Sequence, residues 1–316
     1  MRSILLRRLP LLLLTMFVSS VLIFVASEIL PIDVARNILG QFAPQEAVDA
    51  LNHKLGFDQP PVTRYLHWVG RALTGDFGMS TSQQSRVGPL ILKHAANSGI
   101  LALAALVIII PVALLLGGIA GLYRNRLVDR VISFGSLATT STPEFVIGVL
   151  LLIVFAVELN LLPGSSALMT ESNVLQSPAK LVLPVLTLAI VDVGYVARMM
   201  RASMIEVMQS HYIRAARLRG LPFRRIVLRH ALRNALLTPI TVIMLHINWL
   251  VGGIVVTETI FGYPGLGQLM LTAANGRDVP LLEGGALFFA LVAVISQLLA
   301  DLIYAWLNPR ARATSA

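Results

Sequence analysis

The 316-residue sequence contains no cysteine and only three lysines. The absence of cysteine excludes a disulfide framework and any thiolate metal site. None of the lysines (Lys54, Lys93 and Lys180) follows a glycine, so the chain has no phosphate-binding loop of the G-x-x-x-x-G-K-[ST] type. The sequence therefore predicts that this chain is not an ATP-hydrolysing enzyme, and that any such activity belongs to another subunit.

Histidine is also sparse: the six histidines are scattered along the chain, and no H-E-x-x-H pair, which could form a zinc site, occurs. His246 could bind a metal, but a hydrogen-bonded histidine inside a helix bundle is the simpler interpretation. We expect no metal and no cofactor on this chain.

Charge is scarce, at 13% of residues, whereas 56% are hydrophobic. Soluble domains have about 25% charged and about 45–50% apolar residues. The mean hydropathy is +0.78. These values predict a membrane protein, and an all-α one, because a helix satisfies its own backbone hydrogen bonds in lipid.

Six apolar stretches approach or exceed the ~20 residues that a helix needs to cross a bilayer. They are Leu9–Ile29, Ser98–Tyr123, Val131–Leu159, Ala179–Met199, Pro239–Phe261 and Gly284–Leu307. The first also resembles a secretory signal, but its apolar run exceeds the roughly 7–15 residues of such signals, which favours an uncleaved span.

Arginine placement predicts the orientation, because short cytoplasmic loops collect Lys and Arg. Arginines gather at the N-terminus, after the second span, after the fourth span and at the C-terminus. All four regions lie on one side if the chain crosses six times, so both termini are expected in the cytoplasm. The net charge of +9 is explained by these loops and does not require a nucleic-acid partner.

The predicted organisation has three parts: residues 1–30, with the first span; residues 31–97, an extracytoplasmic segment; and residues 98–316, a five-span core containing a cytoplasmic loop at 200–237. Within the expected extracytoplasmic segment, the sequence pattern predicts helices at Ala47–Leu55 and Val62–Leu73. Leu66, Val69 and Leu73 share one face of the second helix. The segment is too small for a core of its own, and we expect it to pack on the outer ends of the spans.

The cytoplasmic loop contains seven arginines and no acid between His211 and Asn234. Gly220 and Pro222 predict the end of one helix, and periodicity resumes at Phe223. Ala215, Ala216 and Gly220 are small residues that let another surface approach the backbone, so a docking element is one interpretation. A basic anchor that contacts lipid headgroups is the other.

Acidic residues inside spans are the remaining candidates, since ionisable groups there normally face a bundle interior or water. Asp192 lies in the fourth span and could pair with Arg198, and Glu258 lies late in the fifth. With His246, these residues could line a pathway or a gate. Such acids would also suit a proton-coupled transporter, although no inverted repeat of the spans is evident.

Several stretches resemble the permease subunits of ABC importers, and more closely the first membrane subunit of the dipeptide/oligopeptide/nickel group. They are YIRAARLRGL at Tyr212–Leu221, the following LRHALRNALLTPITV, GDFGMS at Gly75–Ser80, Val255–Gly285 and Asp301–Arg312. The broad importer signature begins Glu-Ala-Ala, whereas this chain has Arg214 at the first of these positions. That departure puts in doubt a salt bridge at this position, but not docking.

The resemblance implies a type I importer fold in the bacterial inner membrane. It implies a heterodimer with a second permease, two cytoplasmic ATPase subunits that hold ATP and Mg²⁺, and an extracytoplasmic solute-binding protein. Di- or oligopeptides are the expected solutes, and nickel or another small solute is the alternative. A membrane scaffold that transports nothing is a rival of another class.

The resemblance also implies roles for individual residues. The coupling helix that meets the ATPase corresponds here to Tyr212, Arg214, Ala215, Ala216, Arg217, Gly220 and Leu221. The loop after the fifth span is expected to contact the binding protein through Gly262, Pro264, Gly265, Arg277 and Asp278.

Overall fold

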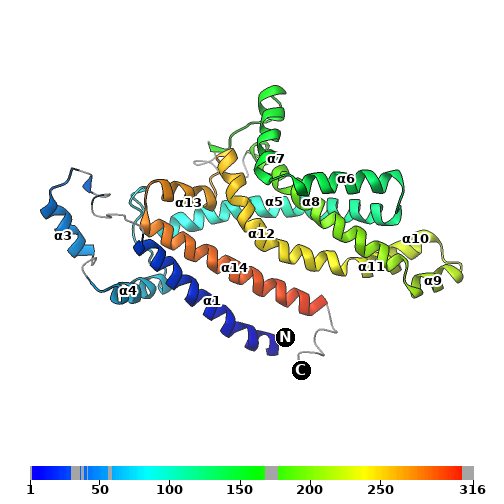
Figure 1. The fold of residues 1–316 in the computed structure, drawn as a ribbon, viewed down its shortest axis with the longest axis horizontal. Coiled ribbons are helices and arrows are strands. Elements are labelled where there is room, and N and C mark those ends of the chain that lie inside the picture. The colour runs from blue at the N-terminus through cyan, green and yellow to red at the C-terminus, as the bar shows by residue number, and fades with distance from the viewer. Residues whose placement is uncertain are drawn as a thin grey trace. The chain divides into compact units, whose positions relative to one another are not determined.

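The computed structural model describes residues 2–29, 36, 39–40, 42–55, 59–167 and 177–307, without the side chains of 2–8, 28–29, 51, 54–55, 245–252 and 304–307. Over these ranges the regular structure is helical, apart from an isolated bridge between Met79 and Arg86 (Figure 1). The chain forms two compact units. The first comprises Met1–Asn97 and Gly265–Leu298, and the second comprises Ser98–Pro264 and Leu299–Ala316.

Long apolar helices account for the predicted spans. In the part of the chain that the structure describes, five helices are long and apolar enough to cross a membrane, or six if one bent helix pair counts as a span. The predicted all-helical membrane fold is therefore confirmed. Four of the five lie in α1 (Arg2–Ile29), α5 (Val87–Leu122), α8 (Ala179–Met208) and α14 (Val279–Leu307), which match predicted spans. The fifth runs from Phe223 to Met244, and the predicted span Pro239–Phe261 lies in α12 (Leu237–Phe261).

The stretch predicted as a single span at Val131–Leu159 is broken. Helix α6 (Leu127–Ser141) ends before Pro143, and α7 (Glu144–Leu151) continues into the π-helical η1 (Leu152–Glu158), with a bend of 103° between the two parts. Thr142 has the extended conformation that a following proline favours, at φ −94° and ψ 128°. The Thr-Pro pair therefore terminates α6, although hydropathy continues across it.

The first unit contains α1, α3 (Gln45–Leu55), α4 (Pro61–Leu73), the start of α5, α13 (Leu266–Asn275) and most of α14. Its core joins the start of α5 to α13 and α14, and the buried side chains are Val87, Ile91, Leu266, Leu269, Ala273 and Leu281. Helix α4 packs on α1 instead, through aromatic side chains. The helices predicted in the 31–97 segment are confirmed within two residues at each end.

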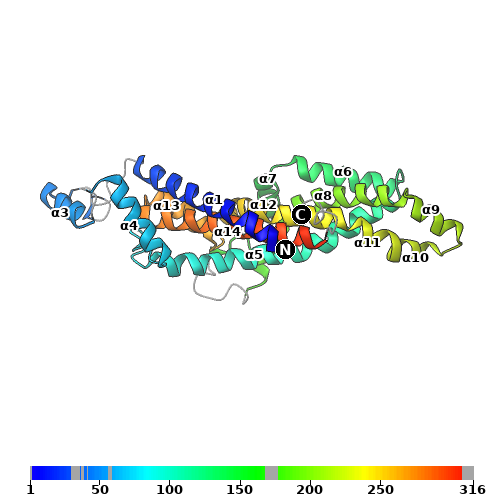
Figure 2. The same ribbon diagram turned by 90° about the horizontal axis from the view of Figure 1, so that it is seen from below.

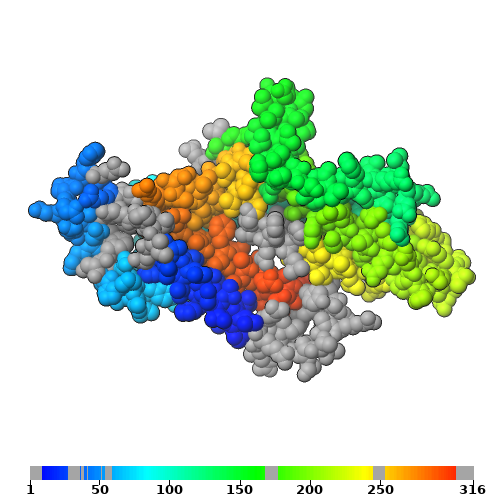
Figure 3. Space-filling model, viewed as in Figure 1, coloured from blue at the N-terminus to red at the C-terminus, as the bar shows by residue number. Residues whose placement is uncertain are grey.

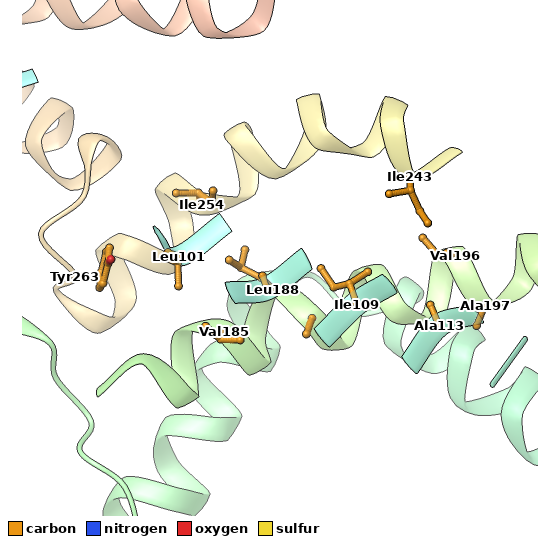
Figure 4. Close-up of a cluster of buried hydrophobic side chains, with 12 residues drawn as sticks. Leu101, Ile109, Ala113, Val185, Leu188, Val196, Ala197, Ile243, Ile254 and Tyr263 are labelled. Carbon is orange, nitrogen blue, oxygen red and sulfur yellow. The ribbon is translucent and has the colours of Figure 1, made fainter. Parts of the chain in front are cut away.

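The second unit is organised around α8, which packs on α6, α7 and α12 (Figures 1 and 2). Figure 4 shows the buried cluster that α8 shares with α5 and α12, where Leu188 and Val185 lie near Leu101 and Ile254. These are aliphatic side chains from different helices, so the cluster is a packed core of the bundle.

Two glycines four residues apart bring α5 and α8 into close contact. A Cβ atom at Gly117 would meet the Ala197 carbonyl and lie 2.7 Å from Met200 Cβ, and one at Gly121 would lie 2.7 Å from Met204 Cβ. Small residues at this spacing are a common means of close helix packing in membranes. The approach depends on glycine because any larger side chain would collide with α8.

Candidate functional site

The basic loop folds as a short helix, α9 (His211–Leu218), followed by a turn and by α10 (Phe223–Arg225), η4 (Ile226–Ala231) and α11 (Leu232–Ala235). Gly220 adopts a left-handed conformation at φ +74°. The Gly220 amide donates to the Arg217 carbonyl and the Leu221 amide to the Ala216 carbonyl, as in a Schellman motif. The predicted helix end at Gly220 is confirmed, and its cause is this glycine-dependent cap.

One face of α9 is buried in the chain's own core. Ile213 and Ala216 pack with Met200 and Met204 of α8 and with Ile226 of η4. Ala216, one of the small residues singled out in the sequence, therefore faces inward and supports the helix.

The opposite face of α9 is exposed. His211, Arg214, Ala215 and Leu218 recur at helical spacing along it, and Leu218 is 85% exposed. Phe223, at the start of α10, is also exposed. Figure 3 shows this segment at the surface of the second unit. Apolar side chains on an exposed basic surface are typical of an interaction site.

Hydrogen bonds fix α9 and α11 to each other and to α8. The Asn234 side-chain amide donates to the Tyr212 hydroxyl at 2.8 Å, which links α11 to α9. Ser203 of α8 donates to the Ala235 carbonyl of α11 at 2.9 Å. The exposed face of α9 is therefore held on a firm support.

A buried ion pair that the sequence did not reveal lies on the same helix α8. Arg201 donates two hydrogen bonds to Asp129 of α6, at 2.5 Å from Nε and 2.8 Å from Nη2. The Asp129 carboxylate also accepts bonds from the Asn125 amide and the Ser133 hydroxyl. This bidentate pair ties α6 to α8. Asp129 escaped prediction because its partner is distant in the sequence.

Glu258 is buried within the second unit near the end of α12, and the Ser98 hydroxyl donates to it at 2.5 Å. Asp192 lies half-buried on α8. The Arg198 guanidinium lies over the Tyr195 ring, 5.9 Å from the ring centroid, as in a cation–π contact. The side chain of His246 lies outside the described residues.

A second carboxylate in this region is Glu144, at the start of α7. Thr257 of α12 donates to it at 2.5 Å, and the other carboxylate oxygen occupies the space beside Gly253. Glu144 and Glu258 therefore both bond within the bundle, to α12 and α5 respectively. Among the residues that the structure describes, no group of three or more His, Asp or Glu side chains is placed to hold a metal.

The loop after α12 begins at Gly262, which is left-handed at φ +59°. Pro264 and Gly265 are buried, Gly262 is half-buried and Arg277 is exposed. Of the residues predicted to contact a binding protein, Arg277 is thus the one presented at the surface, and the others shape the loop.

Asp278 is fully buried and joins this loop to the 31–97 segment. Its carboxylate accepts bonds from the Ser80 hydroxyl at 2.5 Å, the Ser82 hydroxyl at 2.7 Å, the Ser82 amide and the Leu281 amide. Burial alone would raise the pKa of Asp278, but these donors together hold the pKa below its usual value. The Ser80 end of the GDFGMS motif is therefore a partner of Asp278.

Taken together, the fold and the site define a class: a multi-span helical membrane protein with a basic, surface-exposed helix mounted between two spans. Residues 113–313 match the family described as the binding-protein-dependent transport system inner membrane component, and residues 1–91 match the N-terminal region of such membrane components. The chain belongs to this family. It is the permease subunit of a binding-protein-dependent ABC importer and a multi-pass inner-membrane protein.

Similar proteins agree with this assignment. The glutathione transport system permease protein GsiC of Escherichia coli K12 is 34% identical over 298 residues, which cover 94% of this chain and 95% of GsiC. GsiC of Shigella dysenteriae serotype 1 matches to the same extent. The crystal structure of an amino acid ABC transporter with histidines has a TM-score of 0.53 and 17% identity, and covers 68% of this chain and 93% of that one. The last comparison supports the fold alone.

Proposed function

We propose that this chain supplies half of a translocation pathway and receives movement from a separate ATPase subunit through the exposed face of α9. A homologous second permease would supply the other half. ATP and Mg²⁺ would be held by two cytoplasmic ATPase subunits, so this chain hydrolyses no ATP. Both termini and α9 would then lie in the cytoplasm, in agreement with the arginine distribution.

The two-faced packing of α9 is the observation that carries this proposal. Ile213 and Ala216 fix the helix to α8, while Arg214, Ala215 and Leu218 are presented outward. A loop that served only as a basic anchor for lipid would need neither the buried face nor the bond between Tyr212 and Asn234.

Mechanistically, closure of the ATPase pair would displace α9 and, with it, the end of α8. Helix α8 packs on α6, α7 and α12, so its displacement would shift the bundle between inward and outward access. Such a rigid-body change has two states, and the nucleotide biases one of them. Arg217, Gly220 and Leu221 complete the predicted docking segment at its C-terminal end.

Replacement of Ala215 provides the direct test. Ala215→Trp places a bulky group on the exposed face, and Ala215→Ser is the matched control, because it preserves small size at the same position. We expect Ala215→Trp to lower ATP-dependent uptake by roughly tenfold, which corresponds to about 1.4 kcal/mol of lost contact. The rate of ATP hydrolysis would then no longer be stimulated by the solute and its binding protein.

Measurements of uptake and ATP hydrolysis in reconstituted vesicles would separate the outcomes. Normal uptake in Ala215→Trp would contradict docking at α9. Ala216 and Gly220 are poorer test positions, because Ala216 lies in the core and Gly220 has a left-handed backbone that strains any other residue. The purified chain without its partners should hydrolyse no ATP.

Di- or oligopeptides are the proposed solutes, because relatives at 34% identity are named as glutathione permeases and glutathione is a small peptide. Asp192, Glu258 and His246 are proposed to line or gate the pathway. Uptake that depends on ATP and resists a proton uncoupler would exclude the proton-coupled alternative. Competition of uptake by dipeptides, glutathione and nickel would distinguish the solutes.

Contact with the binding protein is proposed at the loop after α12, with Arg277 as its exposed member. Pro264, Gly265 and Asp278 would act by fixing the loop's shape, and Gly262 by ending α12. Arg277→Glu should weaken stimulation of the ATPase by the binding protein. An unchanged concentration dependence on binding protein would argue against this contact.

A further inference from the structure

Helix α4 has two adjacent apolar faces, and within the described ranges one of them packs on another helix. Tyr65, Trp68 and Ala72 recur at i, i+3 and i+7, and all three are half-buried. Val62, Leu66 and Leu73 recur at i, i+4 and i+11 on the neighbouring face and are 70%, 62% and 83% exposed. Helix α4 therefore contacts the first span through Tyr65 and Trp68, and it leaves Leu66 and Leu73 exposed.

The packed face meets α1 through an aromatic cluster. The Phe24 ring lies 5.5 Å from the Tyr65 ring, edge to face, and 6.1 Å from the Trp68 ring. The Ser20 and Tyr65 hydroxyl oxygens are 2.8 Å apart and share a hydrogen bond. These contacts, made along about one turn of α1, fix the depth at which α4 lies beside the span.

The depth follows from helix geometry. The apolar part of α1 runs from Leu9 to Ser27. At about 1.5 Å per residue, Phe24 lies about 5 Å and Ser20 about 10 Å inside the Ser27 end of that stretch. Helix α4 contacts α1 at both residues. It therefore lies beside the part of α1 that is inside the hydrocarbon region, and not beyond the Ser27 end of the apolar stretch.

Other apolar side chains of α1 within two turns of this contact are also exposed. Phe17, Val18, Leu22 and Val25 are exposed on α1. Val62, Leu66 and Leu73 of α4 are likewise apolar and exposed. The remaining face of α4 is polar and basic, with Arg64, His67 and Arg71 at i, i+3 and i+7. Basic residues opposite an aromatic and aliphatic face characterise helices that lie in a membrane interface, buried about 5–10 Å.

We propose that α4 is embedded in the leaflet on the side of the 31–97 segment, with acyl chains covering Val62, Leu66 and Leu73. In the orientation proposed above, this is the outer leaflet. Tyr65 and Trp68 lie against α1, about 5–10 Å inside the Ser27 end of its apolar stretch. The polar face, where Arg71 pairs with Asp76, is directed toward the headgroups. The segment is thereby attached to the bilayer at two places, through α1 and through α4.

Site-directed spin labelling tests this placement, and the natural absence of cysteine in this chain makes single labels straightforward. Leu66→Cys and Leu73→Cys would be labelled in the assembled complex in nanodiscs, with accessible cysteines of the other subunits replaced. His67→Cys, which is on the exposed polar face, is the matched control. Two positions on the apolar face guard against misfolding of one variant.

Collision rates with oxygen and with a polar nickel chelate report on the surroundings of each label. At Leu66→Cys and Leu73→Cys we expect the ratio of oxygen to nickel collisions to exceed that at His67→Cys severalfold. A ratio equal to the control would place the face in water and overturn the proposal. Low collision rates with both reagents, whether constant or induced by the binding protein, would mean that protein covers the face and would also overturn it.

Discussion

The ion pair between Asp129 and Arg201 allows a quantitative prediction. Removal of the carboxylate in Asp129→Ala leaves the Arg201 guanidinium and the Asn125 amide without the acceptor they now share. Because the pair ties α6 to α8, we expect the second unit to lose stability and the coupling between α9 and α6 to weaken.

The magnitude follows from burial. The Asp129 side chain is 4% exposed and that of Arg201 is 31% exposed. Loss of one partner of a buried pair costs about 3–5 kcal/mol. Because Arg201 reaches water and can be partly hydrated after the change, the lower end applies, at about 3 kcal/mol. For a unit of roughly 150–250 residues, that loss lowers the melting temperature by about 6–12 °C.

Thermal unfolding of the complex in nanodiscs, followed by intrinsic fluorescence, measures this shift. Arg130→Ala is the matched control, since Arg130 is an exposed charge one residue away on α6, and it should shift the melting temperature little. The exchanged pair Asp129→Arg with Arg201→Asp should recover part of the loss. Equal shifts for Asp129→Ala and Arg130→Ala would refute the reasoning.

Three further predictions concern packing and pH. Gly121→Ala should destabilise the bundle by about 1–3 kcal/mol through overpacking, whereas Gly99→Ala, with open space around its Cβ on the same helix, should be close to neutral in the same melting assay. Gly253→Ala should displace Glu144, since the new Cβ would lie 2.5 Å from its Oε2, and the penalty should shrink when Glu144 is also replaced by Ala. Asp278→Asn should destabilise at neutral pH. The pKa of Asp278 is lowered in the folded state, so its carboxylate stabilises the fold fully above about pH 5. The difference in melting temperature between Asp278→Asn and the native chain should therefore be largest there and should disappear as the pH falls through the folded pKa. Melting curves at a series of pH values measure this difference.

Hydropathy and the positions of glycine and proline were sufficient to predict most of the long helices and the end of α9. The apolar stretches reappear in long helices, and the end of α9 lies at Gly220, because both depend on residues adjacent in the sequence. The break at Thr142 and Pro143 also had a local signal in the proline. Hydropathy alone concealed it, since apolar residues continue on both sides.

The site was less accessible from the sequence, because its contacts join distant residues. Asp129 is 72 residues from Arg201, and no local pattern marks that pair. The small residues Ala215 and Ala216 looked equivalent, yet Ala215 is exposed and Ala216 is buried, since the helix turns about 100° from one residue to the next. Which face is buried depends on where α8 lies, and the sequence does not specify that.

The shared core of α8 and α9 has a mechanical consequence. Ile213 is buried against the same side chains that fill the last turns of α8, so the two helices behave as one stiff body. A load applied to α9 would reach α8 through side-chain packing, and the connecting backbone at Gln209 and Ser210 would carry little of it. Substitutions that soften this core, such as Met204→Ala, should therefore slow transport even when every ATPase contact is intact.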